Sequence, residues 1–424
     1  MWSRASLSVL FLAVHAWHWR VIVVDPGVGF GDVGLYQWWA WDALERGTWP
    51  VLDHAWVYPA LAVLPVVAPG LASTVEWAPY ASAWMLLVTV ANAVATVALA
   101  RRSRLAALWY LLFLAVLGPV AFGRLDALAV PFAVVGLLAA VRRPRLAAVL
   151  LTVGAWVKVA PGVLVLPLLV VARRRVRDVV VPAGLVCVAV VGAVAAGGGL
   201  RNVVSFASAQ EGRGLQLESV AATWWVVQWV TGGDGGARYD EDLITWEAVG
   251  PGTGVAADLL GWLLPVGVGL VTWLAWRART RLAPAELLAW SGLALTLVLI
   301  VVNKVGSPQF LTWLAAPVAV GLALWSRARD DGAAEASEGA PFGWPLVAAW
   351  CLVLAALTHL VFPLGYFGLV AGDPAVGWTL VARNVLLAAL LCAVVVRLAV
   401  VGRRTAVVGR RRAARERGAG GRSD

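Results

Sequence analysis

The chain has 424 residues, of which 61% are hydrophobic and 14% are charged, and its mean hydropathy is +0.82. A soluble domain typically carries about 25% charged residues, so this composition excludes a soluble globular fold. The net charge of +10 comes from arginine clusters beside apolar stretches. That is the positive-inside pattern of a membrane protein rather than a nucleic-acid surface, so we expect the lipid bilayer, and no nucleic acid, as a partner.

The apolar stretches are continuous and close to the roughly 20 residues that cross a bilayer as a helix. We therefore predict an all-α, polytopic integral membrane protein with ten to thirteen helical segments. Segments 57–70 and 220–231 are too short for ordinary spans and are expected to be broken or re-entrant. Segment 146–171 contains Lys158 and Pro161, which predicts one kinked helix or two half-helices. The predicted segments are 5–24, 57–70, 78–100, 105–121, 125–141, 146–171, 178–197, 220–231, 255–276, 282–302, 308–326, 344–362 and 378–400.

Arginine clusters punctuate these segments, and the positive-inside rule puts the clusters in the cytoplasm. We predict a multi-pass protein of the plasma membrane whose first segment is retained rather than cleaved. The connections 25–56 and 198–254 then lie on the extracytoplasmic side. The transmembrane domain is expected to cover 1–402, followed by a basic, disordered cytoplasmic tail over 403–424.

The first outer connection combines acidic and aromatic residues. In its stretch 33–46, Tyr36, Trp39, Ala40 and Ala43 fall on one helical face, which predicts a helix lying in the membrane interface. Asp32 stands at the start of that helix, where it could act as a general base or simply as a helix cap.

Two further carboxylates in this connection need less explanation. For Asp42 and Asp53 we favour an ordinary solvated loop charge over a functional one. Asp53 is nevertheless kept as a candidate, because it shares the connection with Asp32 and precedes the aromatic stretch that contains Tyr58.

Charged residues at membrane depth are costly and therefore mark candidate sites. Lys158 and Lys304 are the two lysines of a chain with 32 arginines, which suggests a role for their compact ammonium groups. The alternative is chance, with the side chains reaching to the interface. Arg124 lies with Asp126 in a short outer turn and adds a polar pair there.

Two polar motifs complete the candidate set. In GRGLQLES (212–219), Arg213 could hold a phosphate through its planar guanidinium, or it could form a loop ion pair with Glu218; Gln216 lies between them. In NKVGSPQF (303–310), Ser307 and Gln309 flank a proline that interrupts the helix. Irregular polar backbone at membrane depth is tolerated only where it lines protein or a wet cavity, which favours a site.

The sequence gives no sign of a metal or cofactor. The four histidines and three cysteines show no metal-ligand spacing, and no nucleotide-binding loop or nucleophile elbow occurs. We therefore expect neither a metal nor a cofactor.

Four motifs, in the same order along the chain, resemble glycosyltransferase family 87. DVGLYQWWAWDALERGTWPVLDHAWVYPA is similar to its D-x-x-x-Y … G-x-x-P … YPP loop, and AWVKVAPGVLVLPLLVVARRR to its G-x-x-x-K-x-x-P helix with a basic turn. GRGLQLES and NKVGSPQFLTWL resemble its R-G-L-Q-x-E-S and S-P-Q-Y/F-x-x-W segments. Two features depart from the family: YPA replaces YPP, and GRLD stands where many relatives carry a GQ pair.

The resemblance implies a GT-C fold and a polyprenyl-phosphate-mannose-dependent mannosyltransferase. Such an enzyme moves a sugar from a polyprenyl-phosphate donor to a glycolipid or glycan acceptor, with inversion, on the extracytoplasmic face. Asp32 aligns with the family's catalytic base. The candidate ligands of the donor phosphate are Arg213, Lys158, Lys304 and Arg124, and the candidate substrate-binding residues are Tyr36, Asp53, Tyr58, Gln216, Glu218, Ser307 and Gln309.

Two other classes remain open from the residues alone. A lipid flippase or solute transporter would also explain broken helices and intramembrane charge, although its two halves should resemble each other and we find no such repeat. An inert structural membrane protein would leave the polar helix breaks without a purpose.

Overall fold

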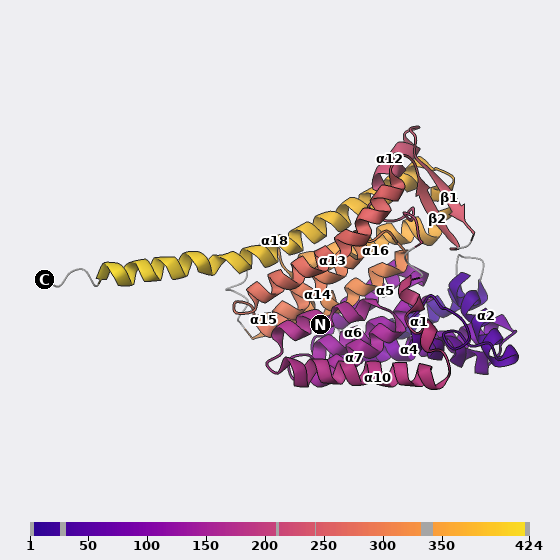
Figure 1. The fold of residues 1–424 in the computed structure, drawn as a ribbon, viewed down its shortest axis with the longest axis horizontal. Coiled ribbons are helices and arrows are strands. Elements are labelled where there is room, and N and C mark those ends of the chain that lie inside the picture. Colours follow the sequence, from indigo (N-terminus) through magenta and orange to yellow (C-terminus); the bar gives the residue numbers. More distant parts are fainter. Residues whose placement is uncertain (1–3, 26–30, 209–211, 242, 332–341, 420–424) are drawn as a thin grey trace.

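A computed structural model describes residues 4–25, 31–208, 212–241, 243–331 and 342–419. It is an elongated bundle of helices with a small β-hairpin at one end, and the C-terminal helix extends beyond the other end (Figure 1). Nine helices of the described residues are long and apolar enough to cross a membrane. The predicted all-α, polytopic fold is thereby confirmed.

The helices follow the predicted segments closely. The α-helices are α1 (Arg4–Val24), α2 (Gly31–Arg46), α3 (Val63–Val67), α4 (Trp77–Ala100), α5 (Arg104–Leu117), α6 (Asp126–Ala139), α7 (Pro144–Val157), α8 (Ala160–Val163), α9 (Val165–Val171), α10 (Val181–Ala196), α11 (Ser205–Ser208), α12 (Thr223–Val230), α13 (Thr253–Ala278), α14 (Pro284–Val301), α15 (Ala315–Asp330), α16 (Trp344–His359), α17 (Tyr366–Val370) and α18 (Pro374–Ala419). Short 3₁₀ or π segments are η1 (Ala60–Ala62), η2 (Ala68–Leu71), η3 (Gly118–Ala121), η4 (Val176–Val180), η5 (Leu200–Asn202), η6 (Pro308–Leu314) and η8 (Leu360–Leu364).

A two-stranded antiparallel hairpin adds β structure that the sequence did not predict. β1 (Gly236–Asp240) pairs with β2 (Thr245–Val249), and Tyr239 lies opposite Trp246. Both strands are short and of mixed polarity, and an isolated hairpin of this size is marginal in water. It is stabilised here by the loop that packs beside it, a contact that local sequence does not reveal.

Segment 146–171 is two half-helices rather than one kinked helix. Helix α7 ends at Val157, Lys158 takes an extended conformation, and the chain returns through α8 and α9. The basic turns before α7 and after α9 lie at the same end of the bundle, because Arg145 Nε and Asp178 Oδ1 are 2.9 Å apart. Two arginine clusters on one side are therefore compatible with the chain course between them.

Helix length sets the depth of that break. Helix α7 has 14 residues, which at about 1.5 Å per residue span roughly 21 Å, less than the roughly 30 Å of a bilayer core. The neighbouring helix α6 also has 14 residues and begins at Asp126. The end of α7 and the start of α6 therefore meet below the level that a full span would reach.

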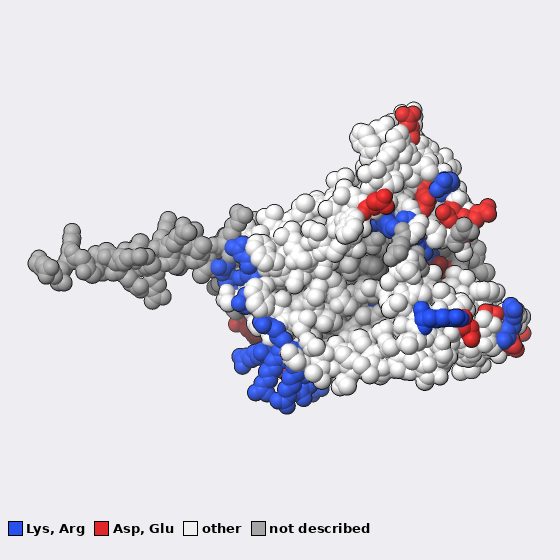
Figure 2. Space-filling model, in the orientation of Figure 1, with Lys and Arg blue, Asp and Glu red and all other residues white. Residues whose placement is uncertain are grey.

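Charge is distributed unevenly between the two ends of the molecule. Figure 2 shows lysine and arginine side chains gathered at the end from which α18 leaves the bundle, whereas most acidic side chains in view lie at the opposite end. We refer to these as the basic end and the hairpin end. The polarity matches the arginine clusters that the sequence places between apolar segments.

Helix α2 packs against the short helices that follow it. The face predicted from periodicity is buried, since Tyr36, Ala40 and Ala43 are at most 2% exposed, while Trp38 is exposed. Segment 57–70 is broken, as expected, into η1, α3 and η2, and this irregular stretch is tied to α4 because Tyr80 Oη donates a hydrogen bond to Val66 O. The short segment 220–231 contains only α12. Because α2 packs against α3 and segment 57–70 is tied to α4, helix α2 is held against the bundle.

The C-terminal helix is longer than expected. Its apolar part, Pro374–Val401, is one of the candidate spans, and its backbone continues as a helix to Ala419. The region 403–424 was expected to be a disordered tail. Alanine and arginine are strong helix formers, so the helix can extend through them as far as Ala419.

The in-and-out course of α7 to α9 is testable by cysteine labelling. In a chain whose three native cysteines are replaced, Arg143→Cys and Arg174→Cys should react with an impermeant thiol reagent from the same side of sealed vesicles. Val75→Cys, which precedes α4 at the hairpin end, should react only from the other side. Labelling of positions 143 and 174 from opposite sides would contradict this fold.

Candidate functional site

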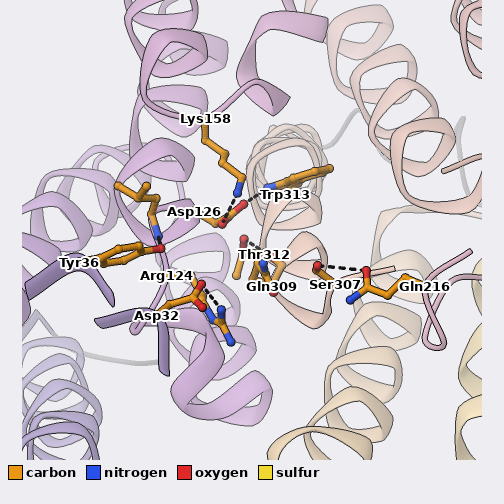
Figure 3. Close-up of polar contacts among 11 residues, drawn as sticks. Asp32, Tyr36, Arg124, Asp126, Lys158, Gln216, Ser307, Gln309, Thr312 and Trp313 are labelled. Carbon is orange, nitrogen blue, oxygen red and sulfur yellow. Dashed lines mark hydrogen bonds and ion pairs between the residues drawn. The ribbon is translucent and has the colours of Figure 1, made fainter. Parts of the chain in front are cut away.

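Asp32 and Arg124 form an ion pair at the hairpin end of the bundle. Asp32 lies in the first turn of α2, where the helix dipole favours a negative charge. Arg124 lies in the turn between η3 and α6, so the pair joins α2 to the bundle (Figure 3). The position at the start of the helix and the charged contact therefore coexist at Asp32.

A second ion pair lies at the break after α7. Lys158 Nζ is 3.6 Å from Asp126 Oδ2, and Asp126 Oδ1 accepts a hydrogen bond of 2.6 Å from Trp313 Nε1 (Figure 3). The carboxylate is at the first residue of α6 and the ammonium follows the last residue of α7, so each charge sits at the helix end that favours its sign. Three distant parts of the chain meet at this carboxylate.

Aromatic side chains pack around these charges. Lys158 Nζ lies 4.6 Å from the centroid of the Tyr58 ring, a cation–π geometry, and the rings of Tyr58 and Tyr36 are 6.1 Å apart. Tyr36 Oη accepts a hydrogen bond from Leu125 N at 3.3 Å. Burial raises the pKa of both phenols, so both remain neutral at physiological pH and act through hydrogen bonds and their rings.

A cavity of about 520 Å³ opens beside the second ion pair. Its wall includes three cationic residues from separate segments, Lys158, Arg213 and Lys304, and no acidic residue of the described chain. The remaining wall is largely aromatic and aliphatic, with Phe310 and Leu264 among its members. A pocket that is apolar except for clustered cations suits an amphipathic anion.

Loop 212–219, which carries Arg213, is held on one side by the hairpin. Leu217 N donates to Trp246 O at 2.9 Å, and Ala248 N donates to Leu215 O at 2.8 Å. Glu247 Oε1 accepts from Gly214 N at 2.7 Å. The loop therefore runs beside β2 like a third strand, and this contact fixes the residue next to Arg213.

On its other side the loop contacts the segment between α14 and η6. Gln216 N donates to Lys304 O at 2.9 Å, and Gln216 Oε1 accepts from Gly306 N at 2.9 Å. Gln216 Oε1 also accepts from Ser307 Oγ at 3.5 Å (Figure 3). A Cβ at Gly306 would lie 2.2 Å from Ser219 N, so only glycine allows this approach of the two backbones. Arg213 and Lys304 are thereby brought to one cavity.

Helix α18 supplies the third contact to the loop. Arg383 donates a hydrogen bond to Glu218 O, and Asn384 Nδ2 donates to Ser219 O at 3.1 Å. Both side chains are at most 3% exposed. Neither residue is among the predicted site residues, although an arginine and an asparagine inside the apolar segment 378–400 are themselves a signal for a buried polar function.

The two alternatives for Arg213 require different contacts. Within the part of the chain that the structure describes, Arg213 makes no ion pair, so the expected loop pair with Glu218 is not formed. Its Nε atom is buried without a hydrogen-bond partner in that same part. Arg213 therefore presents a guanidinium to the cavity with hydrogen-bonding capacity to spare.

Glu218 is buried, and one of its carboxylate oxygens has no hydrogen-bond partner among the described residues. Burial raises the pKa of Glu218 to about 7, against the opposing effect of the Arg383 and Arg124 charges. The carboxyl group does not line the 520 Å³ cavity. It is held behind the loop by α18.

The other predicted residues fall into two groups. Ser307 and Gln309 line the cavity together with Tyr58, and Gln309 Oε1 is buried without a partner in the described chain. Asp53 is exposed and accepts a hydrogen bond of 2.6 Å from Trp49 N within its own turn, so it closes that turn. Arg124 is outside the cavity wall because it pairs with Asp32.

No family model matches the sequence, and no curated protein matches it. The chain is similar in structure to ArnT from Cupriavidus metallidurans, in the apo state and bound to undecaprenyl phosphate. The apo comparison covers 92% of this chain and 77% of ArnT, with 16% identity and a TM-score of 0.47. The complex gives 93% and 78%, with the same identity and TM-score. Membership of glycosyltransferase family 87 stays a prediction from four motifs.

The raised pKa of Glu218 predicts a pH-dependent stability. Between the ordinary value of 4.5 and about 7 the native state holds a proton that the unfolded chain has lost, so stability falls as the pH rises through this window. A shift of this size corresponds to at most about 3 kcal/mol. The melting temperature of Glu218→Gln in detergent should therefore rise relative to that of the unchanged protein between about pH 5 and pH 8. The exposed Glu241→Gln should leave the profile unchanged, and parallel curves for Glu218→Gln would contradict the prediction.

Proposed function

We propose that the protein is a membrane glycosyltransferase that takes a sugar from a polyprenyl-phosphate donor. The observation that carries this proposal is the convergence of Lys158, Arg213 and Lys304 on an otherwise largely apolar cavity. A polyprenyl-phosphate sugar has the matching chemistry, because an anionic phosphate joins a long apolar tail to a polar head.

The donor phosphate is the leaving group, so the cations act on it directly. When the bond between the sugar C1 and the phosphate oxygen breaks, the phosphate gains one negative charge and needs no proton to leave. Cations fixed near that oxygen stabilise the developing charge. Arg213 is best placed for this, because Lys158 already neutralises Asp126 and Arg124 already pairs with Asp32.

The acceptor hydroxyl needs a base, and Asp32 is the candidate. In a single displacement the hydroxyl oxygen bonds to C1, its proton passes to the Asp32 carboxylate, and the donor phosphate departs from the opposite face with inversion. A glycosidase needs a paired acid and base because its leaving group is an alcohol, whereas one carboxylate suffices here. Arg124 holds Asp32 in place and links it to α6, whose first residue pairs with the cavity residue Lys158.

The remaining site residues are assigned to the substrates. Tyr58 offers an aromatic face in the cavity wall, and the buried Tyr36 packs against its ring and holds it in place. Ser307 and Gln309 offer hydrogen bonds in the cavity wall. Gln216 and Glu218 act through the loop that carries Arg213. Asp53 lies outside the cavity wall and has no substrate role in this proposal.

The finer specificity rests on the motif resemblance. Mannose as the sugar, and a glycolipid or glycan as the acceptor, are properties of the family that the four motifs resemble. We assign the site to the extracytoplasmic side because the arginine clusters lie at the other end of the bundle and the positive-inside rule puts them in the cytoplasm.

Replacing the proposed base should abolish transfer. Purified Asp32→Asn protein, incubated with radiolabelled polyprenyl-phosphate-mannose and a membrane lipid extract, should form glycolipid product at least about 10²-fold more slowly, as expected for the loss of general base catalysis. Asp25→Asn, an exposed aspartate of the same connection, serves as the control. Product formation at an undiminished rate would remove Asp32 from the base role, and movement of the lipid without any product would favour a flippase.

Removing the proposed phosphate ligand should act on the donor. Arg213→Ala should raise the donor KM and lower kcat/KM by about 10²-fold, because a charge-assisted contact of roughly 2 to 3 kcal/mol is lost. Arg201→Ala removes an exposed arginine of the same outer region and should leave both constants unchanged. A donor KM equal to that of the unchanged protein would show that Arg213 does not hold the phosphate.

A further inference from the structure

A second cavity lies between α1 and α4, at the basic end of the bundle. It has a volume of about 720 Å³ and is lined by residues of both helices, by Arg101, which follows α4, and by Arg104, the first residue of α5. We call it the α1–α4 groove. It shares no wall residue with the 520 Å³ cavity, and the proposed transfer reaction makes no use of it.

Polar contacts near the middle of α1 and α4 hold the two helices together beside the groove. Asn92 Nδ2 lies 3.3 Å from His15 Nε2, and Asn92 Oδ1 accepts a hydrogen bond of 2.7 Å from Tyr110 Oη. One turn nearer the basic end on the same face of α4 lies Thr96, opposite Phe11 in the wall of the groove. The two helices are therefore joined by polar contacts on the hairpin-end side of Thr96, and they leave a space between them on its basic-end side.

Thr96 carries an unusual polar atom for a membrane helix. Its side chain is only 7% exposed, and its hydroxyl oxygen has no hydrogen-bond partner among the residues that the structure describes. A threonine inside a helix usually donates to the carbonyl four residues earlier, as Thr152 does to Ala148 O at 2.7 Å. An unpaired buried hydroxyl is costly, so a partner from outside the chain is expected.

The chemistry of the groove changes along its length. Toward the middle of the bundle its wall is apolar, with Ala93, Phe11 and the exposed Leu12. At the basic end Arg101 and Arg104 line it, and no described acidic residue does. Along the groove, the apolar wall is followed by the buried hydroxyl and then by the two guanidinium groups. A phospholipid has the same order of acyl chain, glycerol ester and phosphate.

We propose that the α1–α4 groove binds an anionic phospholipid of the cytoplasmic leaflet. The positive-inside rule puts the basic end in the cytoplasm, and basic pockets between transmembrane helices on that side suit anionic headgroups. Arg101 and Arg104 hold the phosphate, Thr96 donates to an ester oxygen, and the acyl chain lies along Phe11 and Leu12. The bound lipid fills the space between α1 and α4 on the side of the membrane opposite the proposed transfer site.

Photo-crosslinking tests the site directly. The purified full chain in detergent is irradiated with phosphatidylglycerol that carries a diazirine in one acyl chain, and the labelled peptides are mapped by mass spectrometry. Label should appear within 7–12 and 93–100, and Arg101→Gln/Arg104→Gln should reduce it about ten-fold. The exposed pair Arg142→Gln/Arg143→Gln, at the same end of the bundle, should not.

Three results would overturn the proposal. Label absent from both segments would mean that no phospholipid occupies the groove. Equal labelling by a phosphatidylcholine probe would mean that the arginines select no net charge. Competition by inorganic phosphate as strong as that by unlabelled phosphatidylglycerol would point to a soluble anion.

Thr96→Val gives a second readout that does not depend on the arginines. In lipid-free detergent the melting temperature should be unchanged or higher, because the substitution removes an unpaired hydroxyl. The rise in melting temperature on adding phosphatidylglycerol should be smaller than for the unchanged protein. An equal rise would contradict the role of Thr96, and Thr152→Val, which removes a paired hydroxyl away from the groove, is the matched control.

Discussion

A charge at membrane depth has to be neutralised, and the ion pair between Asp126 and Lys158 meets that requirement where two half-length helices meet. Each helix ends short of a full span and brings one charge to the junction, so the break and the pair depend on each other. Trp313 fastens η6 to the same carboxylate. The cavity lies beside this junction because η6, the break after α7 and the loop with Arg213 all converge there.

Much of the fold could be predicted from hydropathy and arginine placement. The spans at 5–24, 78–100 and 282–302 agree with helices α1, α4 and α14 to within two residues at either end, because their apolar runs are long and bounded by loops. Segment 146–171 was ambiguous, since a lysine and a proline are compatible with a kink or with a break. The hairpin escaped prediction because its strands depend on the adjacent loop for their stability.

The candidate site was predictable in its residue types and only partly in its contacts. Lys158, Arg213 and Lys304 were selected as cations in unusual places, and the structure brings them to one cavity. The contacts that support these positions could not be predicted, because Asp126, Trp313 and Glu247 are distant in sequence from the residues that they contact. Arg383 and Asn384 were not predicted although they interrupt an apolar span, because the loop that they hold is about 165 residues away in sequence.

The close approach of Gly306 to Ser219 has a mechanical consequence. With no side chain between the two backbones, there is no flexible spacer to absorb a shift, so the loop of Arg213 and the segment of Lys304 translate together. Helix α18 grips that same unit through Arg383 and Asn384. A tilt of α18 would therefore move Arg213 and Lys304 together. Lys158 would keep its position because it is paired with Asp126 of α6, so the cavity between Lys158 and the other two cations would widen.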